Sequence, residues 1–86
     1  MFPSTARGNN PERWEKFLTA LDEKLQLGLL DYLKRVQSYH FEEDVLYIVP
    51  GNSEDQKYLQ RDAVFQQLQI LAQDTTGVMS VKVKAA

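Results

Sequence analysis

The sequence contains no cysteine, so disulfide bonds and thiolate metal sites are excluded and the chain has no thiol redox chemistry. It also lacks a surplus of positive charge. Ten lysines and arginines against twelve aspartates and glutamates give a formal net charge of -2, whereas phosphate-driven nucleic-acid binding usually shows a basic balance. Hydrophobic residues make up 43% of the chain and charged residues 26%, which argues against a disordered, collagen-like or low-complexity chain and indicates a folded one.

Long apolar runs are missing as well. The most prominent one, Val45 to Pro50, is far shorter than the roughly 20 residues of a membrane span, and residues 1–10 lack the apolar core of a signal peptide. We therefore expect a cytoplasmic protein with no membrane partner. Its 86 residues suit a single domain, which we place at residues 11–84, after a flexible leader or linker end at residues 1–10.

Two helices are predicted in the first half of the chain. Asn10-Pro11 is a typical helix start, because the asparagine accepts from free N–H groups of the first turn and proline at the first helical position gives up no hydrogen bond. Apolar residues at three- and four-residue steps then predict a helix from Pro11 to about Leu25. Gly28 marks the boundary to a second, shorter helix that ends near Val36. The buried stripe of the first helix consists of Trp14, Phe17, Leu18, Leu21 and Leu25.

From Gln37 onward the pattern is that of strands. Tyr39 and Phe41 alternate with polar residues, and the run Val45 to Val49 is rich in β-branched and aromatic side chains. The two runs are separated by Glu43-Asp44. This arrangement predicts an antiparallel hairpin with an acidic turn.

A long third helix and a last strand complete the prediction. Ser53 is the expected N-cap, because acids and a glutamine follow it in the first turn, and the helix is expected to continue to about Asp74 with a glycine C-cap at Gly77. The last strand alternates apolar with polar residues and is predicted to be buried on one face. The apolar positions of this strand are Met79, Val81 and Val83.

The element order is therefore α-α-β-β-α-β, which predicts an α+β fold with a three-stranded sheet and three helices packed on one face. The other face is expected to be largely solvated, and it is where a function would sit. The predicted core consists of Trp14, Phe17, Leu21, Leu33, Leu46, Ile48, Leu68, Leu71 and Val81.

Residues able to carry catalysis are scarce. His40 is the one histidine, and we interpret it as a partly exposed strand residue rather than a catalytic base or metal ligand. The adjacent acids Glu42, Glu43 and Asp44 lack the spacing and the glycine of a calcium loop, and no Walker A string occurs. We expect no enzymatic activity, no cofactor and no metal.

Nucleic-acid recognition of the KH type is also disfavoured. Such modules clamp a backbone with a Gly-x-x-Gly loop, but Pro50 to Ser53 contains one glycine, and the acids Glu54 and Asp55 that follow would repel a phosphate.

Four cations are the predicted partner-binding residues. Lys82 and Lys84 share one face of the last strand, and Lys57 and Arg61 lie one helical turn apart on the third helix. Such patches pair with acids on a protein partner and affect on-rate and specificity more than affinity. Trp14 is assigned to the core, not to an exposed interface.

Spaced apolar motifs run through residues 12–84. They are Trp14 to Leu21, Leu29 to Leu33, Phe41 to Ile48, Tyr58 to Leu71 and Gly77 to Val83. Together they resemble the C-terminal domain of the gamma/tau subunit of bacterial DNA polymerase III. The resemblance implies a non-catalytic, KH-like domain that tethers the clamp loader to replisome partners, the polymerase catalytic subunit above all. The ATPase of the loader would then lie elsewhere in the polypeptide. One departure is Ser53-Glu54-Asp55, where family members often carry aromatic and basic residues.

Two alternatives stay open. The run Leu46 to Asn52 is similar to the strand end of the N-terminal domain of the bacterial chromosomal replication initiator, which recruits the replicative helicase. The other alternative is a weak binder of single-stranded nucleic acid, with Tyr39, Tyr47 and the lysines of the last strand as a stacking platform.

Overall fold

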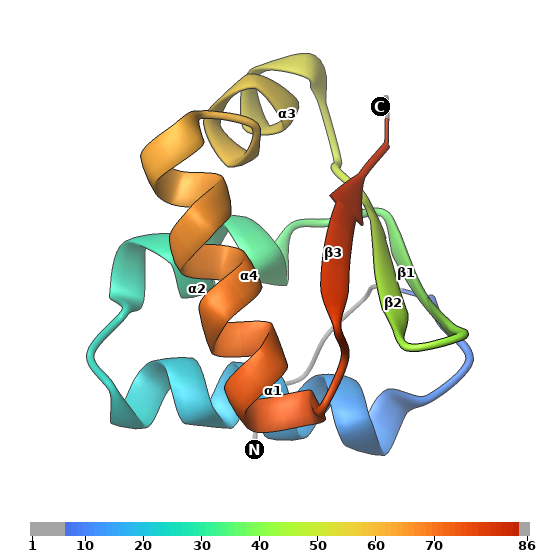
Figure 1. Ribbon diagram of the computed structural model, residues 1–86. Coiled ribbons are helices and arrows are strands. Elements are labelled where there is room, and N and C mark those ends of the chain that lie inside the picture. The colour runs from blue at the N-terminus through green and yellow to red at the C-terminus, as the bar shows by residue number, and fades with distance from the viewer. Residues whose placement is uncertain (1–6, 85–86) are drawn as a thin grey trace.

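The structure is a computed structural model that describes residues 7–84. In this part of the chain, two helices lead into a hairpin and two further helices lead to a last strand (Figure 1). The α+β class with a three-stranded sheet is confirmed. The elements are α1 (Pro11–Glu23), α2 (Leu27–Lys34), β1 (Ser38–Glu42), β2 (Val45–Val49), α3 (Ser53–Leu59), α4 (Asp62–Thr76) and β3 (Ser80–Val83).

The sheet has the order β1-β2-β3. β1 pairs with β2 in the antiparallel sense, as the predicted hairpin requires, and β3 pairs with β2 in the parallel sense. Glu43 and Asp44 form the turn with φ angles of 49° and 65°, the left-handed conformations that a tight two-residue hairpin turn demands. The parallel pairing of β3 follows from the return of the chain through α3 and α4.

The core lies between the sheet and the helices, which cover one of its faces (Figure 1). All of the predicted core residues are buried. The assignment of Trp14 to the core is confirmed, because its ring stacks on Tyr39 with centroids 4.5 Å apart.

The expected long third helix is interrupted. α3 ends at Leu59, and Arg61 has an extended backbone (φ -64°, ψ 137°) before α4 begins at Asp62. In one continuous helix, the positions that share a face with Leu59 would be Asp62 and Ala63. The break instead lets both Leu59 and Leu68 be fully buried.

Several element ends also differ from the prediction. α1 ends at Glu23 rather than at Leu25, and Gly28 lies inside the first turn of α2 rather than at its boundary. The cap of α3 is Asn52 rather than Ser53, since its Oδ1 accepts from the N–H of Asp55 at 2.8 Å. Met79 precedes β3 and is 72% exposed, so its assignment to a buried strand face was wrong.

Residues 7–9 of the predicted leader are attached to β1 and Asn10 caps α1, while residues 1–6 lie outside the described residues. The Arg7 carbonyl accepts from the N–H of Tyr39 at 2.9 Å. The Asn9 side chain accepts from the N–H of Phe41 at 2.9 Å and donates to its carbonyl at 2.7 Å. A Cβ at Gly8 would lie 2.1 Å from the Tyr39 ring, so this close approach requires glycine. The segment thereby covers the outer edge of β1.

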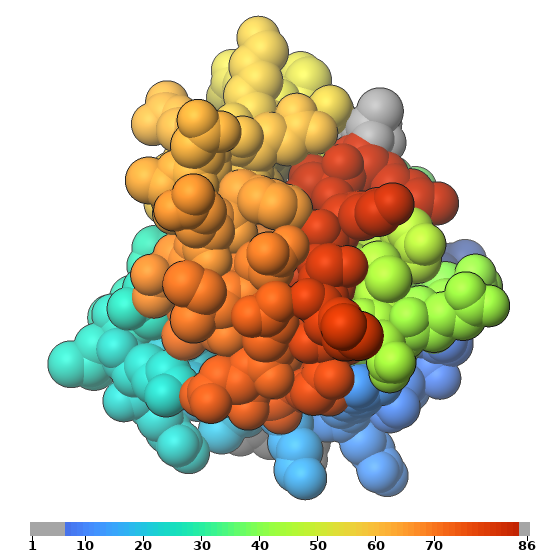
Figure 2. All heavy atoms as spheres, in the orientation of Figure 1, coloured from blue at the N-terminus to red at the C-terminus, as the bar shows by residue number. Residues whose placement is uncertain are grey.

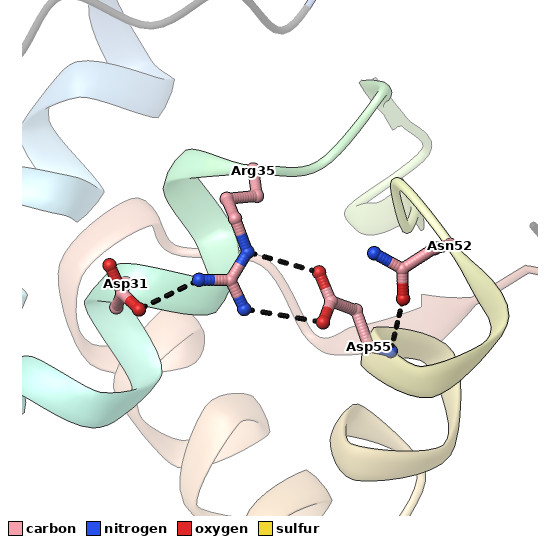
Figure 3. Close-up of polar contacts among 4 residues, drawn as sticks. All are labelled: Asp31, Arg35, Asn52 and Asp55. Carbon is pink, nitrogen blue, oxygen red and sulfur yellow. Dashed lines mark hydrogen bonds and ion pairs between the residues drawn. The ribbon is translucent and has the colours of Figure 1, made fainter.

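An arginine–carboxylate pair fixes α3 against α2 (Figure 3). Arg35 donates from Nε to Asp55 Oδ2 at 3.3 Å and from Nη2 to Oδ1 at 3.2 Å, and its Nη1 reaches Asp31 at 2.7 Å. The hydrogen bond to Asp55 raises the pKa of the guanidinium above its ordinary value, although desolvation opposes it. A Cβ at Gly51 would lie 2.5 Å from the Arg35 carbonyl oxygen, so glycine allows this approach of the two segments.

Candidate interaction surfaces

The uncovered face of the sheet carries polar and charged side chains. The strand register places His40, Tyr47 and Lys82 in one row across the sheet. Lys84 lies on the same face, with Nζ 4.9 Å from the Tyr47 ring centroid. His40 is exposed, and its Nε2 is 3.1 Å from Glu42 Oε1. Lys82 and Lys84 therefore share one face, as their alternation indicates.

Tyr39 does not lie on this face. It is 4% exposed and stacks on Trp14 inside the core, so its predicted place in a stacking platform was wrong. The alternation of β1 explains the difference: Tyr39 and Phe41 are buried while His40 and Glu42 are exposed. Of the two tyrosines of that hypothesis, Tyr47 alone belongs to the open face.

We define residues 57–61 as the α3–α4 corner. Lys57 and Arg61 stand at its two ends. Both are exposed, but Arg61 lies between the two helices, so the pair does not share one helix as predicted. The Arg61 guanidinium carbon is 5.7 Å from the Tyr58 ring centroid. Tyr58 in turn stacks on Tyr32 with centroids 3.9 Å apart, which positions Arg61 relative to α2.

A hollow of about 490 Å³ lies between this corner, α4 and the α1–α2 turn. We call it the leucine groove. Leu25 is 78% exposed and Leu27 is 54% exposed at its border, so the assignment of Leu25 to a buried stripe was wrong. Leu25 adopts φ 59°, a conformation that helix ends normally give to glycine. The other lining residues are Gln26, Gly28, Leu29, Tyr58, Ala63, Val64 and Gln67.

The sequence does not predict the leucine groove, because its leucines stand at positions where the apolar pattern predicts burial in the core. A helix stripe continued to Leu25 predicts burial, and no local signal reveals that the chain reverses direction at Lys24. The one indication of exposed leucines is the cluster of leucines around Gly28, because the apolar faces of the two helices cannot all be buried in one core.

A second hollow, of about 390 Å³, runs beside β3 and is lined by Gln60, Phe65, Val81, Lys82 and Val83. We call it the β3 groove. Figure 2 shows this side of the molecule, where the atoms of α4 (orange) and β3 (red) lie side by side. Tyr58 lines the leucine groove and Gln60 lines the β3 groove. The α3–α4 corner therefore borders both grooves.

Within residues 7–84, no three His, Asp or Glu side chains form a group that could hold a metal ion. No helix of the described chain combines the length and the apolar character needed to cross a membrane.

Comparisons of the chain with models of protein families, with curated proteins and with solved structures gave no match.

Proposed function

We propose that this chain is a non-catalytic protein-interaction domain of a bacterial clamp loader gamma/tau subunit, which tethers the loader to the catalytic subunit of the replicative polymerase. The resemblance of residues 12–84 to that family supports the proposal. So does the element order, which agrees with the expected α-α-β-β-α-β apart from the break between α3 and α4.

The observation that carries the interaction function is the exposure of Leu25 and Leu27 beside the leucine groove. Clustered exposed apolar side chains mark binding surfaces more often than isolated ones do. Burial of a leucine side chain against a partner contributes roughly 1.5–3 kcal/mol. The left-handed backbone of Leu25 is an unfavourable conformation for a leucine, and at 78% exposure the side chain gains little from the core.

The predicted cations fit this function. Lys57 and Arg61 stand at the corner that borders the leucine groove. Lys82 lines the β3 groove, and Lys84 lies over the Tyr47 ring on the open face of the sheet. An apolar centre with a charged rim is the usual anatomy of a protein interface. Rim cations of this kind accelerate association with an acidic partner and make it depend on ionic strength.

The experiment is surface plasmon resonance with the immobilised domain and two purified analytes, the polymerase catalytic subunit and the replicative helicase. Saturable binding of the polymerase is expected. The double substitution Leu25→Ser and Leu27→Ser should weaken it by at least about tenfold. The matched control is Ile70→Ser, which removes an apolar side chain that is 58% exposed on α4 outside the leucine groove.

Binding of the helicase alone would overturn the proposal in favour of the helicase-recruiting initiator domain. Binding of neither protein, or equal losses in the Leu25/Leu27 variant and the Ile70 control, would remove its support from the leucine groove.

A further inference from the structure

The outer edge of β3 has a defined set of outward-pointing backbone groups. Ser80 and Lys84 donate their N–H groups to the β2 side, to the carbonyls of Asp44 at 3.4 Å and of Ile48 at 2.8 Å. Because backbone groups alternate in direction along a strand, the N–H and carbonyl groups of Val81 and Val83 point away from the sheet. An edge of this kind is a template for a further strand.

Glutamine side chains occupy this edge. Gln69 Oε1 accepts from the N–H of Val81 at 3.4 Å, and Gln60 Nε2 donates to the Val83 carbonyl at 3.3 Å. Gln73 Nε2 donates to the Met79 carbonyl at 2.6 Å. A glutamine amide offers the same donor and acceptor as a peptide group, so these side chains imitate a neighbouring strand.

The hydrogen bonds that Gln60 and Gln69 make to β3 can be replaced by hydrogen bonds from an incoming strand. Their lengths of 3.3 and 3.4 Å exceed the usual range for N–H···O bonds, which is centred near 2.9–3.0 Å. Gln60 is exposed and Gln69 is half-buried, so both side chains can swing into solvent without leaving an empty core position. An incoming backbone at normal distance would replace weak bonds by stronger ones.

The two faces beside the edge differ in chemistry. On the helix side, the β3 groove offers the half-buried side chains of Phe65 and Val83. On the open side, Lys82, which also borders the groove, and Lys84 project from alternate positions. A strand added along β3 would place its successive side chains alternately on these two sides. Its sequence is therefore expected to alternate apolar and acidic residues.

A second copy of this chain is a poor occupant of the edge. Two β3 strands side by side would bring the lysines of one copy next to those of the other, and like charges in cross-strand positions are destabilising. An acidic segment meets no such repulsion. The charges therefore favour an acidic segment of a partner over a second copy of this chain.

We infer that the outer edge of β3 binds an extended segment of a protein partner, with alternating acidic and apolar residues, by strand addition. The segment displaces Gln60 and Gln69, inserts its apolar side chains into the β3 groove, and pairs its acids with Lys82 and Lys84. The inference rests on the proposed function as an interaction domain and gives the partner chemistry of one of its surfaces.

The test uses a fluorescently labelled peptide Glu-Val-Glu-Val-Glu-Val-Glu, of typical strand length at about seven residues, and the ¹⁵N-labelled domain. Anisotropy titration should give a Kd below about 1 mM. In NMR spectra, the amides of Val81 and Val83 should show the largest shift changes together with the side-chain amides of Gln60 and Gln69, and the amide of Val81 should become more protected from hydrogen exchange.

Three control peptides separate strand addition from simple charge attraction. Two of them keep the charge of the acidic peptide and carry N-methyl groups on either the valine or the glutamate amides. Because alternate amides of a strand point to opposite edges, the form whose methyl groups face β3 cannot pair and should not bind, whereas the other form should still bind. Lys-Val-Lys-Val-Lys-Val-Lys can pair but carries the wrong charge, and it should bind at least about tenfold more weakly.

Protein variants complete the design. Lys82→Glu combined with Lys84→Glu should weaken the acidic peptide by at least about tenfold. The matched control combines Lys16→Glu on α1 with Lys34→Glu on α2. It changes the net charge by the same amount as the β3 variant and should leave the affinity for the acidic peptide within about twofold.

No binding of the acidic peptide, equal affinities of its two N-methylated forms, or shift changes away from β3 would each overturn the inference. Because the assay contains no polymerase, these outcomes leave the proposed function standing if the polymerase still binds the domain. Conversely, a failure of polymerase binding leaves the peptide result intact.

Discussion

The Asp55 carboxylate, 7% exposed, is held by two hydrogen bonds from the Arg35 guanidinium, which itself is 46% exposed (Figure 3). The pair joins the end of α2 to the first turn of α3. The same arginine also contacts Asp31, whose side chain is 67% exposed. One cation therefore has a buried and an exposed acidic partner.

Arg35→Ala should lower the free energy of unfolding by roughly 1.5–3 kcal/mol, because it leaves a buried carboxylate without its cation. Asp31→Ala, which breaks the exposed bond of the same arginine, should cost about 0.5 kcal/mol or less. Urea denaturation of both variants measures the difference. Equal losses would mean that the burial of Asp55 does not govern the strength of the pair.

Leu68→Ala should lower the free energy of unfolding by about 2–5 kcal/mol, because it removes a fully buried side chain and leaves a cavity. Ile70→Ala on the same helix is the matched control, and it should cost less than about 1 kcal/mol since Ile70 is 58% exposed. Denaturant unfolding of both variants gives the comparison. A change within about 0.5 kcal/mol for Leu68→Ala would show that the buried face of α4 is wrongly assigned.

The fold class, the hairpin and the core were predictable from the sequence because they depend on local periodicity. The alternation in Tyr39 to Phe41 and the apolar run of β2 determine which faces are buried wherever those strands pair. Periodicity does not show how segments that are far apart in the sequence compete for space in the same core. Leu25 continues the stripe of α1, but the core is already filled by Leu21 and Leu29, and the chain turns before Leu25 can reach it.

The candidate surfaces were predictable only in part, for the same reason. Lys82 and Lys84 follow strand alternation and lie on one face as expected. Arg61 was placed on a helix by pattern continuity, whereas the break between α3 and α4 puts it beside Tyr58. Grooves arise where separate elements meet, so the leucine groove and the β3 groove have no signature within any single segment.

Leu25→Gly should raise the free energy of unfolding by roughly 0.5–1 kcal/mol, because glycine adopts φ 59° without the steric cost that leucine bears there. The same substitution should weaken polymerase binding under the proposed function. Leu27→Gly is the matched control: it lies in α2, and glycine there should destabilise by up to about 1 kcal/mol. Thermal unfolding separates the two, and a loss of stability in Leu25→Gly would contradict the backbone argument.

Single-stranded DNA is expected to bind too weakly to saturate at about 50 mM salt. The net charge is -2, and with Tyr39 in the core the open sheet face lacks the second stacking ring of the platform hypothesis. Anisotropy with a labelled oligothymidine across a salt series is the measurement. Saturable binding that falls steeply with the logarithm of salt, and that is lost in Tyr47→Ala, would restore the nucleic-acid hypothesis.

The stability of the domain should fall with pH above about 10 through the ionisation of Tyr39. Burial raises the pKa of this phenol above its ordinary value of 10.0, and the Glu15 carboxylate raises it further. The unfolded chain therefore loses the proton at lower pH than the folded one. It follows that the stabilisation by Tyr39 is complete below the unfolded pKa and is lost as pH rises through the folded pKa.

Tyr39→Phe keeps the ring that stacks on Trp14 and removes the ionisable group. Its free energy of unfolding should decline less than that of the parent between pH 9 and pH 11, both values chosen to bracket the ordinary tyrosine pKa of about 10. Tyr47→Phe, on the open face, is the control for the removal of a tyrosine hydroxyl outside the core. The same decline in Tyr39→Phe as in the parent would show that the ionisation of Tyr39 does not cause the alkaline loss of stability.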